Sequence, residues 1–128
     1  MNKKSKYPVG IGDLAKDLEI TTRTIRYYEE IGLMPPPERA GGGVRVYTKE
    51  EALRLKFILK LKELGLSLAE MEELSGIYED SRSQSEVMPR LVDMLDRHIA
   101  KVDQKIAKLG SLRSELADYR KRIADIKE

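Results

Sequence analysis

The sequence predicts a mostly α-helical protein in two parts: a small head of short helices with one β-hairpin, and a long C-terminal helix that forms a coiled coil. Up to residue 76, short apolar segments with helical spacing alternate with capping residues, glycines and prolines. From residue 86 to 128 the apolar residues follow heptads. Charged residues make up 36% of the chain and aromatic residues 5%, which is typical of helix-rich proteins with a modest core. We therefore expect a head over 1–76, a linker over 77–85 and a dimerisation helix over 86–128.

The first two helices are predicted to form a helix-turn-helix. Apolar residues between Val9 and Leu18 have helical spacing. Thr21 or Thr22 can then cap a second helix, because a threonine oxygen accepts a hydrogen bond from a free amide. That helix ends at Gly32, a residue type favoured just after a helix. Two short helices joined by a turn of three or four residues make a helix-turn-helix.

A small β-hairpin, or wing, is predicted next. Prolines 35–37 cannot continue a helix, and glycines 41–43 permit a tight turn. Val44, Val46 and Tyr47 favour a strand. The head is therefore a winged helix-turn-helix.

Two capping boxes predict the starts of two more helices. The first box spans Thr48 to Glu51, and the second spans Ser67 to Glu70. The polar stretch from Tyr78 to Ser85 is expected to be a loop.

The long helix carries an apolar stripe with alternating steps of three and four residues. Only His98 and Lys105 are polar in this series, and Ile99 and Ile106 lie beside them. This chain has no second long helix to cover the stripe, so we expect a second copy to do so. The candidate dimerisation residues are Leu91, Leu95, Val102, Leu109, Leu112, Leu116, Tyr119 and Ile123.

Gly110 and Ser111 offer an alternative, in which the tail folds back as a helical hairpin. Leu109 and Leu112 keep the heptad spacing across these two residues, which favours a continuous helix.

Charge is unevenly distributed along the chain. Residues 1–62 hold 13 Lys and Arg against 8 Asp and Glu, whereas residues 63–80 hold six acids and no base. A basic region beside an acidic one is compatible with nucleic-acid binding. Ordinary solvated helix faces explain the same distribution equally well.

No catalytic, cofactor or metal site is predicted. The chain has one histidine, no cysteine and no carboxylate pair with acid–base spacing. Glycines 41–43 lack the lysine and the strand-to-helix context of a phosphate loop. His98 is assigned to the coiled-coil seam. No apolar run approaches the ~20 residues of a membrane span, and the basic start of the chain lacks a signal-peptide core. We expect a cytoplasmic protein with no membrane partner.

The second helix is the most informative element for function. Arg23, Arg26 and Tyr27 lie within one turn, after Thr21 and Thr22 at the helix start. A helix N-terminus attracts phosphate, and arginine can bond guanine with two hydrogen bonds. For this cluster alone, a surface helix with ordinary charges is the simpler interpretation.

The wider context changes that interpretation. The string from Thr24 to Glu29, then Gly32-Leu33, a proline pair, residues 43–47 and residues 64–68 resembles the mercury-resistance-regulator (MerR) family. The resemblance covers residues 7–76, with the motifs in order, and extends in architecture to the long tail helix.

The resemblance implies roles for further residues. Arg23 and Arg26 match recognition-helix contacts to DNA, with Tyr27 beside them. Arg39 and Arg45 match wing contacts to phosphates, Tyr47 matches the aromatic residue that anchors the wing, and Lys62 matches a basic residue of a second wing. Many members have Gly-Tyr-Arg at the wing tip, where this chain has Gly43-Val44-Arg45. We therefore expect a weaker hold of the wing on DNA.

The resemblance also implies an antiparallel coiled-coil homodimer that binds a pseudo-palindrome in double-stranded promoter DNA. Distortion of that DNA realigns the promoter elements for RNA polymerase. Metal and redox sensors of the family carry cysteines at the end of the long helix, where this chain has Ile123. A small-molecule effector, if one exists, is expected near Tyr78, Met88, Met94 or Tyr119, although ordinary packing explains these side chains more simply.

Three alternatives remain at this point: an effector-independent repressor or architectural DNA binder, an interaction module that uses its coiled coil, and an enzyme.

Overall fold

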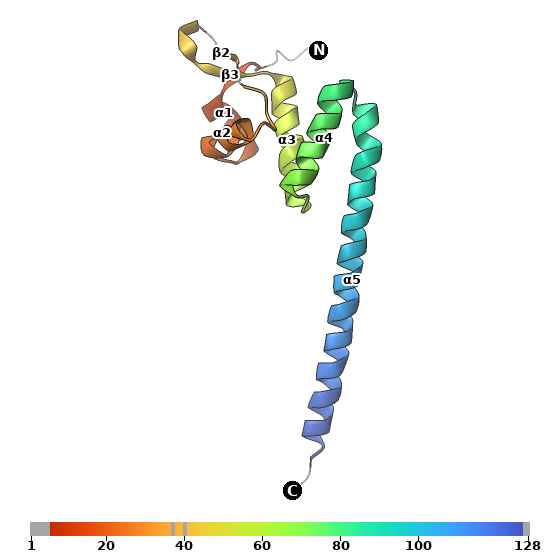
Figure 1. Ribbon diagram of the computed structural model, residues 1–128. Coiled ribbons are helices and arrows are strands. Elements are labelled where there is room, and N and C mark those ends of the chain that lie inside the picture. The colour runs from red at the N-terminus through yellow and green to blue at the C-terminus, as the bar shows by residue number, and fades with distance from the viewer. Residues whose placement is uncertain (1–5, 37, 40, 127–128) are drawn as a thin grey trace, which may run out of the picture. The chain divides into compact units, whose positions relative to one another are not determined.

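The structure, a computed structural model, describes residues 6–36, 38–39 and 41–126, with only the backbone at 38 and 39 (Figure 1). The chain divides into two units, Met1–Arg82 and Ser83–Glu128. The first unit is the head, and the second contains the long helix.

The predicted helix-turn-helix is present in the head. Helix α1 spans Ile11–Leu18 and helix α2 spans Thr22–Glu30, so three residues form the turn between them. Thr21 caps α2, because its hydroxyl accepts a hydrogen bond from the Thr24 amide at 3.1 Å. Each helix buries one face, and the buried side chains are Leu14 and Ala15 of α1 and Ile25 and Tyr28 of α2.

The wing belongs to a three-stranded antiparallel sheet of order β1-β3-β2. Strand β2 spans Glu38–Arg39 and β3 spans Arg45–Tyr47, so the predicted hairpin is present. Between them, Gly42 and Gly43 adopt φ values of 82° and 81°, which glycine tolerates readily. Strand β1, Val9–Gly10, also pairs with β3 and was not predicted. A strand of two residues is too short to show a sequence period.

Two longer helices complete the head. Helix α3 spans Lys49–Glu63 and helix α4 spans Leu68–Ser81. Both predicted capping boxes are present, with all four hydrogen bonds between 2.9 and 3.1 Å. Helix α3 buries Ala52, Leu55, Ile58 and Leu61, and α4 buries Met71 and Leu74.

The loop expected from Tyr78 to Ser85 is wrong. Helix α4 continues to Ser81, and the long helix begins at Gln84, so the break between them is Arg82–Ser83. Arg82 adopts a left-handed conformation, with φ 55°. Arg54 of α3 donates hydrogen bonds to Ser75 and Glu79 of α4, and such tertiary contacts can override weak local propensity.

The second unit is dominated by helix α5, Gln84–Ala124, which is 41 residues long. It is continuous through Gly110, so the alternative of a helical hairpin at Gly110–Ser111 is wrong. Every residue from Ile99 to Ile126 is exposed. Within the described residues, no helix is both long enough and apolar enough to cross a membrane.

Candidate nucleic-acid interface

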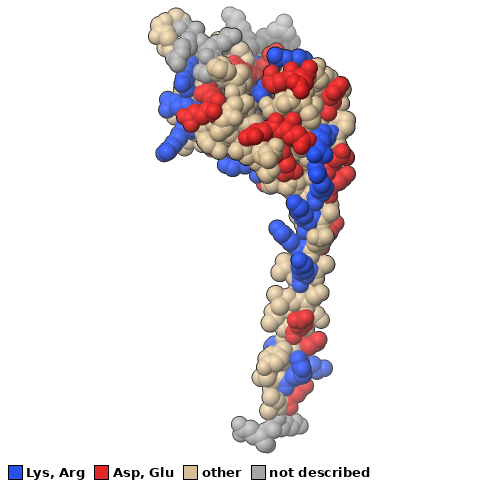
Figure 2. All heavy atoms as spheres, in the orientation of Figure 1, with Lys and Arg blue, Asp and Glu red and all other residues tan. Residues whose placement is uncertain are grey.

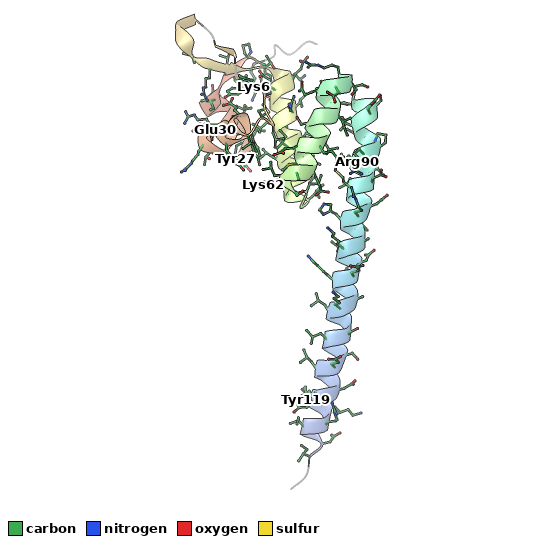
Figure 3. All side chains as sticks on the ribbon, viewed as in Figure 1. Lys6, Tyr27, Glu30, Lys62, Arg90 and Tyr119 are labelled. Carbon is green, nitrogen blue, oxygen red and sulfur yellow. The ribbon has the colours of Figure 1, made fainter. Side chains whose placement is uncertain are left out.

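Helix α2 presents basic side chains on the face opposite its core contacts. Ile25 and Tyr28 point into the head, whereas Arg23, Arg26 and Tyr27 are exposed, Tyr27 by 46%. Figure 3 labels Tyr27 on this helix. Neither arginine has a recorded ion pair among the described residues. The helical period therefore places both guanidinium groups where they can reach a ligand outside the head.

The start of α2 is already used for capping. The Thr21 hydroxyl accepts from the Thr24 amide and lies 3.0 Å from the Thr24 hydroxyl. Thr22 is half-buried. Of the two threonines predicted to contact DNA, Thr21 thus has a local structural role as the helix cap.

A buried carboxylate on α2 fixes the wing. Arg45 Nη1 donates to Glu29 Oε1 at 3.0 Å, and the Tyr47 hydroxyl donates to Glu29 Oε2 at 2.6 Å. The Glu29 side chain is only 8% exposed, and Tyr47 is fully buried. Such charge-assisted hydrogen bonds are stronger than neutral ones. Glu29 therefore joins strand β3 to the helix that carries Arg23 and Arg26.

The environment of Tyr47 favours its protonated form. Burial raises the pKa of the Tyr47 hydroxyl, and its hydrogen bond to Glu29 raises this pKa further. Because Tyr47 is fully buried, the side chain anchors the wing, and a direct contact with DNA would require it to leave the core.

Of the two arginines predicted in the wing, the structure describes the side chain of Arg45 and only the backbone of Arg39. The Arg45 side chain is 31% exposed and is paired with Glu29, so a phosphate would have to share it. The Arg39 backbone lies opposite Arg45 in the sheet, but its side chain is outside the described part of the chain. At the tip, Val44 is 58% exposed.

A second basic position lies at the far end of α3. Lys62 is exposed, and Figure 3 labels it near the end of this helix. A turn follows, in which Gly65 has φ 96°, and the capping box at Ser67 begins α4. Lys62 is thus placed beside a tight turn and has no recorded ion pair among the described residues.

Acidic side chains are concentrated in one part of the head. Figure 2 shows blue and red atoms side by side at the edge formed by α1 and α2, and red atoms gathered over the part of the head that contains α4. The sequence distribution agrees, because residues 63–80 contain six acids and no base. An anionic ligand is therefore disfavoured at α4, and the exposed Arg23 and Arg26 of α2 are candidates for contact with such a ligand.

Sequence reasoning missed Arg54, which ties three parts of the head together. Its guanidinium donates to the Leu33 carbonyl at 2.9 Å, to Ser75 Oγ at 3.1 Å and to Glu79 Oε1 at 3.1 Å. It also lies 5.9 Å from the centroid of the Tyr78 ring. Arg54 thus connects the end of the α2 region with the last turns of α4.

Glu29 was missed as well, although the sequence contained a signal for it. Glu29 lies four residues after Ile25, on the buried side of α2. A carboxylate at such a position requires a partner.

The predicted dimerisation residues are mostly exposed on α5. Val102, Leu109, Leu112, Leu116, Tyr119 and Ile123 are each at least 50% exposed. Leu95 is half-buried, and Leu91 is buried, with 8% exposure.

Comparison with known families decides the classification. A family model described as MerR HTH family regulatory protein matches residues 10–75, and one described as MerR, DNA binding, matches residues 52–119. This chain belongs to the MerR family. The family predicted from the motifs is therefore confirmed.

A curated MerR relative and two solved MerR structures are similar to this chain. The HTH-type transcriptional regulator ZntR homolog of Haemophilus influenzae is 45% identical over 89 residues, which cover 70% of this chain and 64% of that protein. The match therefore spans less than two thirds of that relative.

The solved structures show the same fold. A putative MerR family transcriptional regulator from Listeria monocytogenes has a TM-score of 0.71 at 22% identity, covering 91% of this chain and 89% of the other. PbrR691 from Ralstonia metallidurans CH34, solved in complex with lead(II), has a TM-score of 0.65 at 32% identity, covering 88% and 86%. The winged helix-turn-helix head and the long C-terminal helix are thus those of the MerR family.

Proposed function

We propose that this chain is a DNA-binding transcription regulator that binds a pseudo-palindromic promoter operator as a homodimer and distorts the DNA between the half-sites. The main support for the proposal is the pair of hydrogen bonds that joins α2 to the wing. One buried carboxylate, Glu29, holds β3 against the helix that exposes Arg23 and Arg26. Membership of the MerR family supports the same function.

Each part of the head has a distinct task in this proposal. Arg23 and Arg26 reach base edges or phosphates, because a guanidinium can bond guanine bidentately in the major groove. The N-terminus of α2 accepts a phosphate. Lys62 and the wing backbone contact phosphates on either side. Tyr47 acts indirectly by anchoring the wing, and Arg45 is shared between Glu29 and the DNA backbone.

The exposed face of α5 supports the homodimer. Each buried Leu or Ile side chain contributes about 1.5–3 kcal/mol, so a long exposed stripe strongly favours association. Two copies of the head then present two α2 helices to half-sites related by two-fold symmetry.

A dimer that grips both half-sites can use binding energy to bend or untwist the DNA between them. By family resemblance, this distortion aligns the promoter elements for RNA polymerase, which we propose as the partner at the promoter. Thiolate-based metal sensing is not part of the proposal, because the chain contains no cysteine.

The test is selection of genomic fragments by the purified protein at near-physiological salt, followed by measurement of the bend and twist of the bound fragment. We expect a shared pseudo-palindrome with half-sites separated by whole helical turns, lying between two promoter elements. Recovery of unrelated fragments, or an operator bound without any change in bend or twist, would contradict the proposal.

Salt dependence and a matched pair of variants separate this function from a protein-interaction module. Affinity should fall steeply with salt, because neutralised phosphates release counterions. Arg26→Ala should weaken operator binding. Arg97→Ala, which removes an exposed arginine of α5, should leave binding unchanged.

A further inference from the structure

The exposed apolar side chains of α5 are spaced symmetrically about one point of the helix. Tyr119, labelled in Figure 3, belongs to this set, whose members are between 50% and 67% exposed. Four pairs share a midpoint between Leu112 and Arg113; they are Ile99 with Ile126, Val102 with Ile123, Ile106 with Tyr119, and Leu109 with Leu116.

We propose that a second copy of this chain packs against α5 in the antiparallel register that brings these pairs together, with the two-fold axis between Leu112 and Arg113. The inference rests on the proposed homodimer and specifies its interface. In an antiparallel pair, residues equidistant from the axis on opposite sides face each other, so a symmetric stripe is complementary to itself.

This register differs from the single heptad frame that the sequence suggests. That frame passes through His98 and Lys105, and its antiparallel register with the axis between Gly110 and Ser111 sets Lys105 of one copy opposite Leu116 of the other. It also leaves Ile106, which is 61% exposed, beside the seam. Burying an ammonium group among apolar side chains is costly, whereas burying isoleucine is favourable. The proposed register puts Ile99 and Ile106 in the seam in place of His98 and Lys105.

The proposed stripe changes its heptad frame at the centre of the helix. From Ile99 to Leu109 its steps are three, four and three, so the next apolar residue is due at 113. It occurs instead at Leu112, directly after Gly110 and Ser111. With the two-fold axis at this point, the first half of each helix meets the second half of the other. The layers then remain matched on both sides of the change, and at the axis itself Leu112 of each copy lies opposite Arg113 of the other.

Gly110 supports an axis at this position. A Cβ atom added to Gly110 would meet nothing within 4 Å in the single chain, so packing within the chain does not require a glycine there. A mid-helix glycine is unfavourable for the helix itself. Close approach of a second helix near the axis gives it a function.

Charges beside the seam favour this alignment on one flank and oppose it on the other, where Lys105 of one copy lies beside Arg122 of the second. Asp103 follows Val102, and Arg120 follows Tyr119, so both lie on the same flank of the stripe. The proposed register brings Asp103 of one copy beside Arg120 of the second copy in neighbouring layers. Opposite charges at such flanking positions help to set orientation and register.

Cysteine cross-linking tests the register directly, because the chain has no cysteine of its own. The double variant Ile106→Cys/Tyr119→Cys should form a covalent dimer under mild oxidation. The two sites are 13 residues apart, which is about 20 Å along a helix. A disulfide needs Cβ atoms roughly 4 Å apart, so the two thiols of one helix cannot join.

The matched control is Lys105→Cys/Leu116→Cys, which reports the single-frame register with its axis between Gly110 and Ser111 and should not cross-link. Ile106→Cys alone should also fail, because the proposed register sets this position opposite Tyr119, and only a parallel pair or an antiparallel pair with its axis at Ile106 would bring it against itself. Val102→Cys/Ile123→Cys provides a second test of the proposed register if the first pair disturbs folding, as judged by circular dichroism.

The outcomes separate the register from the homodimer. Cross-linking of the control pair, cross-linking of Ile106→Cys alone, or a dimeric sample in which neither proposed pair cross-links would overturn the register. A parent protein that light scattering finds monomeric at micromolar concentration would overturn the homodimer itself.

Discussion

Replacing Glu29 with glutamine should loosen the wing while leaving the helices of the head folded. The carboxylate accepts one hydrogen bond from Arg45 at 3.0 Å and one from the Tyr47 hydroxyl at 2.6 Å. Glutamine keeps one acceptor oxygen and puts an amide donor in place of the other. One of the two partners therefore loses its acceptor.

The size of the effect follows from the burial of the two partners. If the amide oxygen of the glutamine accepts from Tyr47, Arg45 loses its acceptor and turns to solvent, which is possible because its side chain is already 31% exposed. Loss of this ion pair costs up to about 1 kcal/mol. The opposite choice points the amide NH2 group at Tyr47, whose hydroxyl oxygen can accept from it, but the buried hydroxyl proton is then left without an acceptor, at about 1–3 kcal/mol. The first arrangement should prevail. With the weaker neutral bond to Tyr47 included, we expect a loss of about 1–2 kcal/mol in the free energy of unfolding.

Urea unfolding followed by circular dichroism, at a fixed protein concentration because dimer formation contributes to stability, measures this loss. Operator titration by fluorescence anisotropy should show roughly 5- to 30-fold weaker binding if the wing must be reseated on DNA. Glu30→Gln is the control, because Glu30 is the exposed neighbour on the same helix. If the stabilities of the Glu29 and Glu30 variants agreed within about 0.5 kcal/mol, the clamp would have no energetic role.

Four further predictions concern other parts of the molecule. The pKa of Tyr47 is raised in the folded state, so the unfolded chain loses this proton first, from about pH 10, and stability should fall as pH rises above that value. Tyr47→Phe should make this decline shallower in urea unfolding between pH 9 and 11; equal slopes would contradict the assignment. Arg26→Ala should cost about 1–3 kcal/mol of operator binding and relax specificity at one base pair, which selection from randomised operators detects. Leu116→Asp should yield a monomer with a folded head in light scattering and circular dichroism, and a persistent dimer would show that Leu116 lies outside the seam. Arg54→Leu should accelerate amide exchange over residues 78–81, and unchanged exchange there would mean that the contacts of Arg54 do not hold the end of α4.

Elements built from neighbouring residues were predictable from the sequence. Each capping box joins residues three positions apart, such as Thr48 with Glu51, so one short string contains both partners. The exposed arginines of α2 were also predictable from neighbouring residues. Ile25 and Tyr28 define the buried face of this helix, and the helical period leaves Arg23 and Arg26 on the exposed face.

The sequence by itself determined the order of the helices, the wing, the continuous tail and the basic face of α2, since helical period, capping chemistry and glycine turns act over a few residues. Only the tertiary structure decided strand β1, the length of α4 and the roles of Glu29 and Arg54. The partners of Glu29 lie 16 and 18 residues away, and two partners of Arg54 lie 21 and 25 residues away. No local spacing identifies such partners, because folding of the whole head brings them together, and their buried charge and hydrogen bonds acquire energetic value only in that environment.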